Sequence, residues 1–331
     1  MTSKDEPMKS QQIASLAFAV VAAGSAAAET LPLPETVEPG AKLVEVYADG
    51  RFYEGPTWDP RTGKLYFTAF AKDNQQILRL DAPGKVTVWM DKTEGVNGTF
   101  LSLDGRLLCA QTYGHRVLSL GIGPDGPVDP KTLAADPTWN QPNDICQTPS
   151  GDIYFTDPNF KENDKSAVYR LSRDGKVTKL ISDMAIPNGV IASSDGSTLY
   201  VGDSHRKHWR AYPILPDGTL GPGGLFFDPD TPDRNDPDGM TLDEKGNLYF
   251  TGRGGVWVVQ PDGKPLGLIP VPEFCSNVTF GDQAGKTLYL TCKGKVYSLS
   301  MRVRGGPWLK RPSPPSSALS TQNSELRETS R

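Results

Sequence analysis

The chain has 331 residues, a formal net charge of −4 and 37% hydrophobic residues, with 34 glycines and 29 prolines. This length fits one large β-rich or α/β domain, or two ordinary domains. The slightly acidic balance and the lack of a long basic segment argue against nucleic-acid binding. After the first 30 residues, no apolar segment is long enough to span a membrane.

The first 28 residues have the order of features of an export signal. Lys9 provides a short positive segment, Ile13 to Ala23 are apolar, and three alanines end the segment at Ala28. A short buried helix is the alternative. We expect residues 1–28 to be a signal peptide and the mature protein to be exported, into the periplasm if the source is Gram-negative.

Four cysteines remain in the mature chain, and they do not form a C-x-x-C pair, so a zinc ribbon or thioredoxin-like site is not supported. Export permits disulfide bonds in any of three pairings, whereas buried free thiols are the simpler interpretation for residues in predicted strands. The four are Cys109, Cys146, Cys275 and Cys292.

Short β-rich segments repeat along the chain after residue 40, each preceded by a turn that contains Gly or Asp. The interval of about 45 residues is typical of the blades of a β-propeller. The strand-like segments begin at Leu65, Leu107, Ile153, Leu199, Leu248 and Leu288. The sequence therefore predicts an all-β protein, a six-bladed β-propeller over residues 40–304.

Two segments at the ends of this repeat have separate predictions. KLVEVYAD, from Lys42, is expected to add an outer strand to the last blade and close the ring. Residues 305–331 leave the repeat and are rich in Ser, Pro and charged residues, so we expect a disordered tail.

One polar residue recurs before each strand-like segment. Because the innermost strands of a propeller line its channel, these side chains would surround one mouth of the channel. Two carboxylates and several amide oxygens favour a hard cation, and two such anions without a cation would be costly. Alternatively, Asn and Asp before Gly simply form turns. The six residues are Glu54, Asn97, Asn143, Asn188, Asp238 and Asn277.

The ordered motifs EGPTWDP, PNDI, PNGV and PDGMTLDEKGNLYFT resemble the SMP-30/gluconolactonase/LRE family over roughly residues 40–304. The resemblance implies a propeller with one divalent metal ion in its channel. It implies hydrolysis of sugar lactones or, in relatives, of other lactones or organophosphates. The implied metal ligands are Glu54, Asn188 and Asp238. Asn143 would be a ligand or would hold water or substrate, and Asp238 would also be the proton acceptor.

The chemistry of these residues agrees with that resemblance. An all-oxygen ligand set favours Ca²⁺, with Zn²⁺, Mg²⁺ or Mn²⁺ as alternatives. Such an ion can polarise a lactone carbonyl, while Asp238 or Glu54 accepts a proton from water; alternatively, Asp238 only orients the metal. We expect a hydrolase acting on carboxylic esters, with a sugar lactone such as glucono-1,5-lactone as substrate. The expected substrate contacts are Asn97, Asn143, His115 and Arg116.

Two other functions stay open. The stretch AQTYGHRV, residues 110–117, stands where many bacterial relatives have a sequence like CEHGNRRV, which leaves the substrate preference open. A promiscuous lactonase or phosphotriesterase would need a more apolar mouth, which Tyr113, Trp139 and Phe160 could provide. A non-catalytic propeller that binds carbohydrate or protein is the third function considered. We expect no nucleic-acid partner and no membrane partner after signal cleavage, and the sequence predicts no particular oligomeric state.

Overall fold

The computed structural model describes residues 32–71, 74–229, 236–252 and 254–306. The predicted signal peptide lies outside these residues, as does the predicted tail from residue 307 onward. In the described part of the chain, the structure contains no helix with the length and apolar character of a membrane span.

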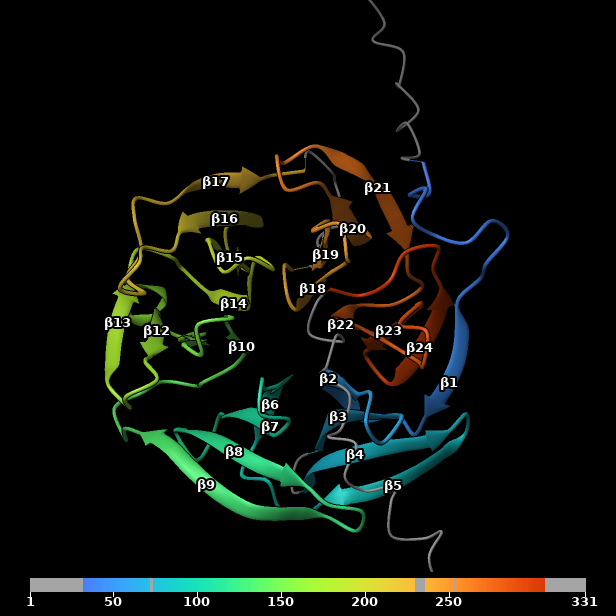
Figure 1. Cartoon of the computed structure of the whole chain (residues 1–331), viewed down its shortest axis with the longest axis horizontal. Coiled ribbons are helices and arrows are strands. Elements are labelled where there is room, and N and C mark those ends of the chain that lie inside the picture. The colour runs from blue at the N-terminus through green and yellow to red at the C-terminus, as the bar shows by residue number, and fades with distance from the viewer. Residues whose placement is uncertain (1–31, 72–73, 230–235, 253, 307–331) are drawn as a thin grey trace, which may run out of the picture. The chain divides into compact units, whose positions relative to one another are not determined.

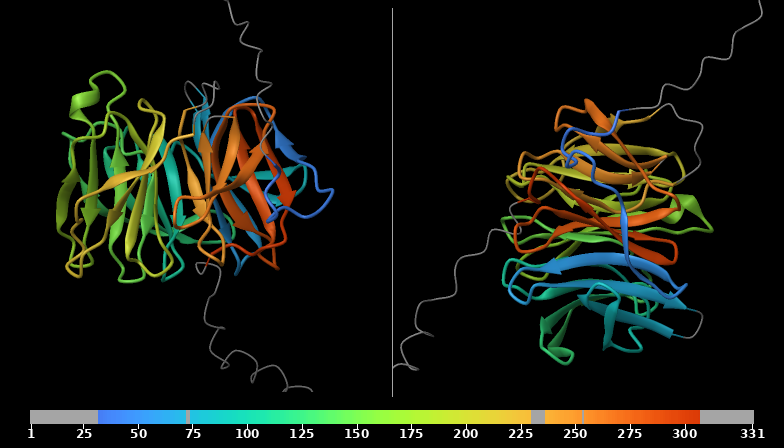
Figure 2. Two further views of the ribbon diagram at one scale, coloured as in Figure 1. Left: turned by 90° about the horizontal axis from the view of Figure 1, so that it is seen from above. Right: turned by 90° about the vertical axis from the view of Figure 1, so that its right-hand side faces the viewer.

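The described residues form six four-stranded sheets arranged as blades around a central axis, with antiparallel pairing between neighbouring strands (Figure 1). The prediction of an all-β, six-bladed propeller is confirmed. Seen from the side, the strands run between two faces that carry the connecting loops (Figure 2).

The first three blades follow one another along the chain. Blade 1 contains β2 (Phe52–Asp59), β3 (Lys64–Ala71), β4 (Asn74–Ala82) and β5 (Lys85–Met90). Blade 2 contains β6 (Val96–Leu101), β7 (Leu107–Gln111), β8 (Arg116–Ile122) and β9 (Pro127–Ala135). Blade 3 contains β10 (Ile145–Gln147), β11 (Ile153–Asp157), β12 (Ala167–Leu171) and β13 (Val177–Ile181), with a short 3-10 helix η1 (Asn163–Lys165) between β11 and β12.

The last three blades complete the ring. Blade 4 contains β14 (Pro187–Ala192), β15 (Thr198–Asp203), β16 (His208–Pro213) and β17 (Gly224–Phe227). Blade 5 contains β18 (Met240–Leu242), β19 (Leu248–Gly252), β20 (Gly255–Val259) and β21 (Pro265–Pro270). Blade 6 contains β22 (Cys275–Gly281), β23 (Thr287–Cys292), β24 (Lys295–Ser300) and β1 (Val44–Ala48).

The ring is closed by a strand from the other end of the chain. β1 pairs antiparallel with β24, with Val44 opposite Ser298 and Ala48 opposite Lys295. The segment from Lys42 therefore supplies the outer strand of blade 6, as the sequence predicts.

The repeated aromatic pair in the second strand of several blades packs the blades against one another. Successive side chains of a strand point to opposite faces of the sheet, so adjacent Tyr and Phe residues contact different neighbours. Tyr66 and Phe67 of β3 are both fully buried and belong to different apolar clusters. Tyr249 and Phe250 of β19 behave in the same way. The LYF motif thus fills the spaces on both sides of a blade.

In four of the six blades glycine follows the recurring polar residue, because the inner strands of neighbouring blades touch around the axis. A Cβ atom at Gly55 would overlap the carbonyl oxygen of Asn97, and one at Gly189 would overlap that of Asp238. Gly98 donates its N–H to the carbonyl oxygen of Asn143 at 2.7 Å. Asn97 lies inside β6 and Asn188 inside β14, so the alternative in which these residues merely form turns is wrong for both.

This close contact makes a stability prediction. Gly189→Ala should lower the free energy of unfolding by about 1–3 kcal/mol, because the added methyl group meets rigid backbone. Gly224→Ala is the matched control, since a Cβ atom at Gly224 has nothing within 4 Å. Urea unfolding of both variants measures the difference; equal stability of Gly189→Ala and the wild type would contradict the packing argument.

Candidate functional site

Five of the six recurring polar residues line a single cavity of about 370 Å³ at one end of the inner strands. They come from the beginnings of the innermost strands or from the residues just before them, which brings five blades to one place. The five are Glu54, Asn97, Asn143, Asn188 and Asp238. The structure therefore brings together all four predicted metal ligands and two of the four predicted substrate contacts.

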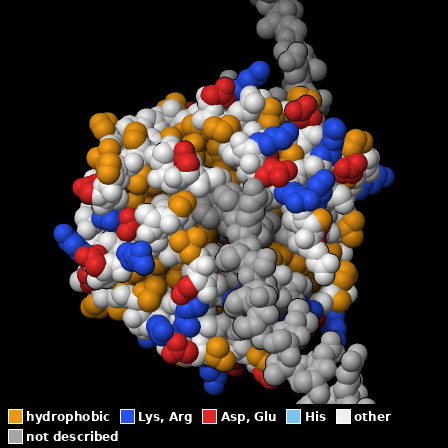
Figure 3. Space-filling view, viewed as in Figure 1, with side chains coloured by type: hydrophobic (Ala, Val, Ile, Leu, Met, Phe, Trp, Pro, Cys, Tyr) orange, Lys and Arg blue, Asp and Glu red, His pale blue; other side chains and the backbone are white. Residues whose placement is uncertain are grey.

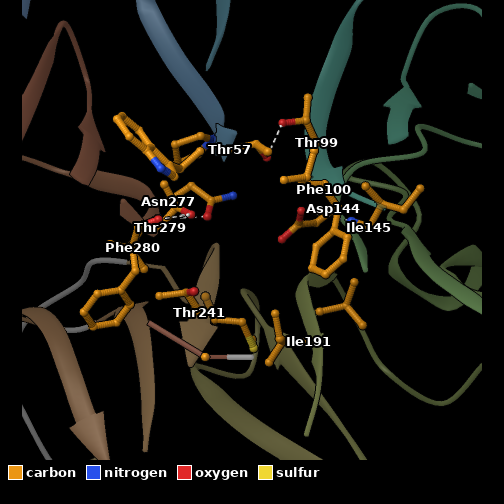
Figure 4. A pocket seen from close by; sticks show the side chains of 17 residues that line it. Thr57, Thr99, Phe100, Asp144, Ile145, Ile191, Thr241, Asn277, Thr279 and Phe280 are labelled. Carbon is orange, nitrogen blue, oxygen red and sulfur yellow. Dashed lines mark hydrogen bonds between the residues drawn. The ribbon is translucent and has the colours of Figure 1, made fainter. Parts of the chain in front are cut away.

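The sixth residue, Asn277, lies deeper along the axis. With Asp144 it lines a second cavity of about 60 Å³, formed by residues farther along the inner strands of all six blades (Figure 4). Asn277 still contacts the first cavity, because its amide nitrogen lies 3.5 Å from Oε2 of Glu54. Its own Oδ1 accepts a hydrogen bond from the N–H of Val278 at 2.8 Å, which turns the side chain along the strand.

Three buried carboxyl groups lie around the axis, and burial raises the pKa of each. The pKa of Glu54 rises to about 8, mainly through loss of hydration and secondarily through the nearby charge of Asp144. Loss of hydration also raises the pKa of Asp144 to about 7. The pKa of Asp238 is raised well above its ordinary value by burial and by the charges of Glu54 and Asp144. Glu54 and Asp238 share a side-chain hydrogen bond, which requires a proton on one of them.

Asp144 is a residue of this group that the sequence analysis missed. In the QPND motif it occupies the position after the recurring polar residue, where four other blades have glycine. Its side chain points toward the centre of the second cavity, opposite Asn277 (Figure 4). A carboxylate at a repeat position that is glycine in four of the other five blades is the signal that could have identified it.

A buried oxygen without a partner indicates how the first cavity could hold a cation. Oδ1 of Asn188 is buried and has no hydrogen-bond partner among the described residues, although the same side chain hydrogen-bonds to Asp238. Buried acceptors are rarely left unsatisfied. The described residues contain no group of three or more His, Cys, Asp or Glu side chains placed to hold a metal. Amide oxygens would therefore have to complete a ligand set with Glu54 and Asp238, and such hard oxygen donors fit a divalent cation.

The upper wall of the same cavity is aromatic. Phe52 and Phe274 stack with ring centroids 6.4 Å apart, and Phe70 lies opposite Phe52 in the register of β2 and β3. Tyr113 and Phe160 also line the cavity and are exposed. We call these five residues the aromatic rim. The site thus combines the aromatic rim with a polar floor, which is formed by the five recurring polar residues that line the cavity.

The sequence model of the SMP-30/Gluconolactonase/LRE-like region matches residues 52–294. The chain belongs to the SMP-30/gluconolactonase/LRE-like family. The resemblance stated from the sequence motifs is confirmed.

Relatives within this family cover most of the chain. It is 28% identical to a gluconolactonase of Zymomonas mobilis over 306 residues, with 79% of this chain and 82% of that protein covered. It is also 28% identical to pentonolactonase XacC of Haloferax volcanii, covering 74% of this chain and 82% of the relative. Among solved structures, a gluconolactonase from Xanthomonas campestris matches with a TM-score of 0.70 and 28% identity, covering 80% of this chain and 91% of that one.

The other predicted contacts lie elsewhere in the described part of the structure. Arg116 forms an ion pair with Glu94 at 2.6 Å and lines a different pocket, together with Gln111. His115 does not line the cavity of Glu54 either, and its Nδ1 is buried without a partner among the described residues.

The apolar mouth suggested by the sequence also differs in its members. Trp139, expected at the mouth, is buried between blades and packs on Phe155 with ring centroids 4.9 Å apart. Tyr113 and Phe160 do line the cavity. The structure adds polar wall residues that sequence reasoning missed, among them Thr112, Gln141 and Ser204.

The buried carboxyl groups make a pH prediction for the metal-free protein. Because the folded-state pKa of Asp144 lies above its unfolded value, unfolding releases a proton between about pH 4 and pH 7. The contribution of Asp144 to the free energy of unfolding therefore falls as pH rises through that window. Asp144→Asn removes it and should stabilise the chelator-treated protein at pH 8 by about 2 kcal/mol, with little effect at pH 4.

Urea unfolding at the two pH values measures this difference. Asp125→Asn, at an exposed turn, serves as the control and should leave the pH dependence unchanged. An Asp144→Asn variant that is less stable than the wild type at pH 8 would contradict the assignment of a desolvated carboxyl group.

Proposed function

We propose that this protein is a hydrolase of carboxylic esters that opens a lactone ring to the hydroxy acid with the help of one divalent cation. A sugar lactone such as glucono-1,5-lactone is the proposed substrate. The convergence of Glu54, Asn143, Asn188 and Asp238 in one cavity carries the proposal. The relatives named gluconolactonase and pentonolactonase support lactone hydrolysis as the reaction.

Glu54, Asn188 and Asp238 would hold the cation, with Asn143 as a further ligand or as a holder of substrate. Ca²⁺ is proposed first because the donors are all oxygen atoms, and Zn²⁺, Mg²⁺ or Mn²⁺ are alternatives. When bound, a cation of this kind supplies Lewis-acid polarisation of a carbonyl oxygen. The unpartnered Oδ1 of Asn188 supports this ligand set.

The chain's own residues then transfer the proton and orient the substrate. A water molecule attacks the lactone carbonyl, and a carboxylate oxygen of Asp238 accepts its proton. Asp238 returns the proton to the alkoxide that leaves when the ring opens. Burial raises the pKa of Asp238 above its ordinary value in the cation-free protein, and a general base works best when its pKa lies near the working pH. In the alternative, Asp238 only orients the cation. Asn97 and Asn143, at the cavity wall, can hydrogen-bond the ring oxygens.

Substitution of the floor residues tests this assignment. Asp238→Asn should reduce kcat/KM by at least about 100-fold, and Glu54→Gln should raise the Ca²⁺ concentration needed for half-maximal activity. Asp104→Asn, at an exposed turn, is the control and should leave both quantities unchanged. Activity of Asp238→Asn at saturating Ca²⁺ separates the two roles, because excess cation restores activity after loss of a ligand but not after loss of the base. Full activity after exhaustive chelation would overturn the proposal.

A second candidate, a promiscuous lactonase or phosphotriesterase, is favoured by the aromatic rim. Exposed aromatic side chains at a cavity mouth can bind an alkyl or aryl substituent that a sugar lactone lacks. Phe160→Ala should raise KM for an alkyl-substituted lactone about tenfold and change KM for glucono-1,5-lactone much less. Leu215→Ala, which removes an exposed apolar residue outside the cavity, is the matched control.

One hydrolysis screen separates these functions. The protein is assayed with a pH indicator against sugar lactones, aliphatic lactones and organophosphates, with and without added Ca²⁺. Turnover confined to sugar lactones supports the first proposal, and turnover of only the apolar substrates supports the second. Absence of metal-dependent turnover favours a non-catalytic propeller that binds carbohydrate or protein. The predicted signal peptide would place the activity outside the cytoplasm.

A further inference from the structure

Two of the four buried cysteines face each other in blade 6. Cys275 at the start of β22 lies directly opposite Cys292 at the end of β23. The N–H of Lys293 donates to the carbonyl oxygen of Phe274 at 2.9 Å. This bond joins the residues next to the pair, which identifies Cys275 and Cys292 as a non-hydrogen-bonded pair of an antiparallel ladder. In such pairs the Cα atoms are about 4.5 Å apart and the side chains are closest.

We propose that Cys275 and Cys292 form a disulfide bond in the mature protein. The expected Cα separation falls within the range of about 4.4–6.8 Å that disulfide geometry allows. The two thiols already contact each other through a side-chain hydrogen bond. Both side chains are buried in the same apolar cluster, so the bond would replace one internal contact by another.

The positions of the other two cysteines exclude a disulfide bond with either member of this pair or with each other. Cys109 in β7 lies opposite Thr99 and Leu118, and Cys146 in β10 lies opposite Tyr154. These two belong to different blades and to different apolar clusters. They should remain free.

The oxidation needs a disulfide of a small molecule or of a protein oxidant as co-reactant. The thiolate of one cysteine attacks that disulfide, forms a mixed disulfide and releases one thiol. The thiolate of the second cysteine then displaces the other half of the oxidant. The net change removes two electrons and two protons from the cysteine pair and yields two thiols from the oxidant. Because the folded protein buries both cysteines, this exchange belongs to the folding stage, in an exported compartment.

The bond would fix the strand register beside the candidate site. The pairing of β22 and β23 shifts by one residue between Cys275 and Asn277, leaving Ser276 as a bulge. Oγ of Ser276 donates to the carbonyl oxygen of Tyr53 at 2.6 Å and so joins blade 6 to blade 1. Glu54 follows directly, and Asn277 contacts it. A covalent link one residue before the bulge would restrain this junction.

Mass spectrometry of the unreduced protein tests the bond directly. The full chain is refolded in glutathione buffer, alkylated in denaturant without reduction, and digested. We expect a cross-linked peptide that contains Cys275 and Cys292, and alkylated Cys109 and Cys146. Alkylation of all four cysteines, or a cross-link that includes Cys109 or Cys146, would overturn the proposal. Refolding supplies the oxidant itself, so the result does not depend on the predicted export.

Thermal unfolding with and without reductant gives an independent measurement. Reduction should lower the Tm of the oxidised wild type by about 5–10 °C, because the bond closes a loop of moderate length. Cys109→Ala/Cys146→Ala, the matched control, should show the same shift, whereas Cys275→Ala/Cys292→Ala should show none. If a double variant does not fold, the comparison within the wild type stands. A Tm of the wild type that reductant leaves unchanged would count against the bond.

Discussion

The contact between inner strands around the axis is the constraint on which the rest of the structure depends. Four of the six strand starts meet the next blade at a position that has no room for a side chain. Gly55, Gly98, Gly189 and Gly239 occupy these positions, since a Cβ atom at each would overlap the next blade. The polar residue just before each glycine is thereby carried to the channel wall. The same backbone contact that closes the ring therefore also concentrates oxygen atoms at its centre.

The oxygen atoms at the centre include buried carboxyl groups, whose negative charges are unfavourable because water cannot hydrate them there. Glu54, Asp144 and Asp238 are all buried, and the charges of Glu54 and Asp144 raise the pKa of Asp238. Protons or a cation must compensate such a group, because isolated buried charges are strongly unfavourable. Proton sharing between Glu54 and Asp238 is the compensation that the chain can provide by itself. On the outer surface seen in Figure 3, by contrast, acidic and basic side chains are interspersed.

The sequence predicted the parts of this arrangement that depend on the repeat. The polar residue recurs at one repeat phase, which assigns all six side chains to one mouth, and five of them do line the cavity there. It could not predict that Asn277 lies deeper, because its Oδ1 bonds to the next N–H in its own strand. Arg116 was assigned to the site from a family loop, whereas a local ion pair with Glu94 holds its guanidinium elsewhere. The aromatic rim includes Phe274 and Phe160, which lie outside the strands. The alternation of side chains along a strand cannot predict which way such residues point.

The aromatic rim affects the charged residues of the polar floor because it lowers the local dielectric constant. Apolar rings around a mouth reduce the water that can screen the carboxylates beneath it, and weaker screening strengthens every charge interaction in the cavity. A substrate that covers the rim would reduce hydration further, which raises the free-energy cost of unpaired charges on the floor. Proton transfer from an attacking water to Asp238 would then be favoured most when the substrate is seated. In the proposed reaction the rim would therefore affect catalysis as well as the choice of substrate, because it would control the environment in which the buried carboxylates change their charge.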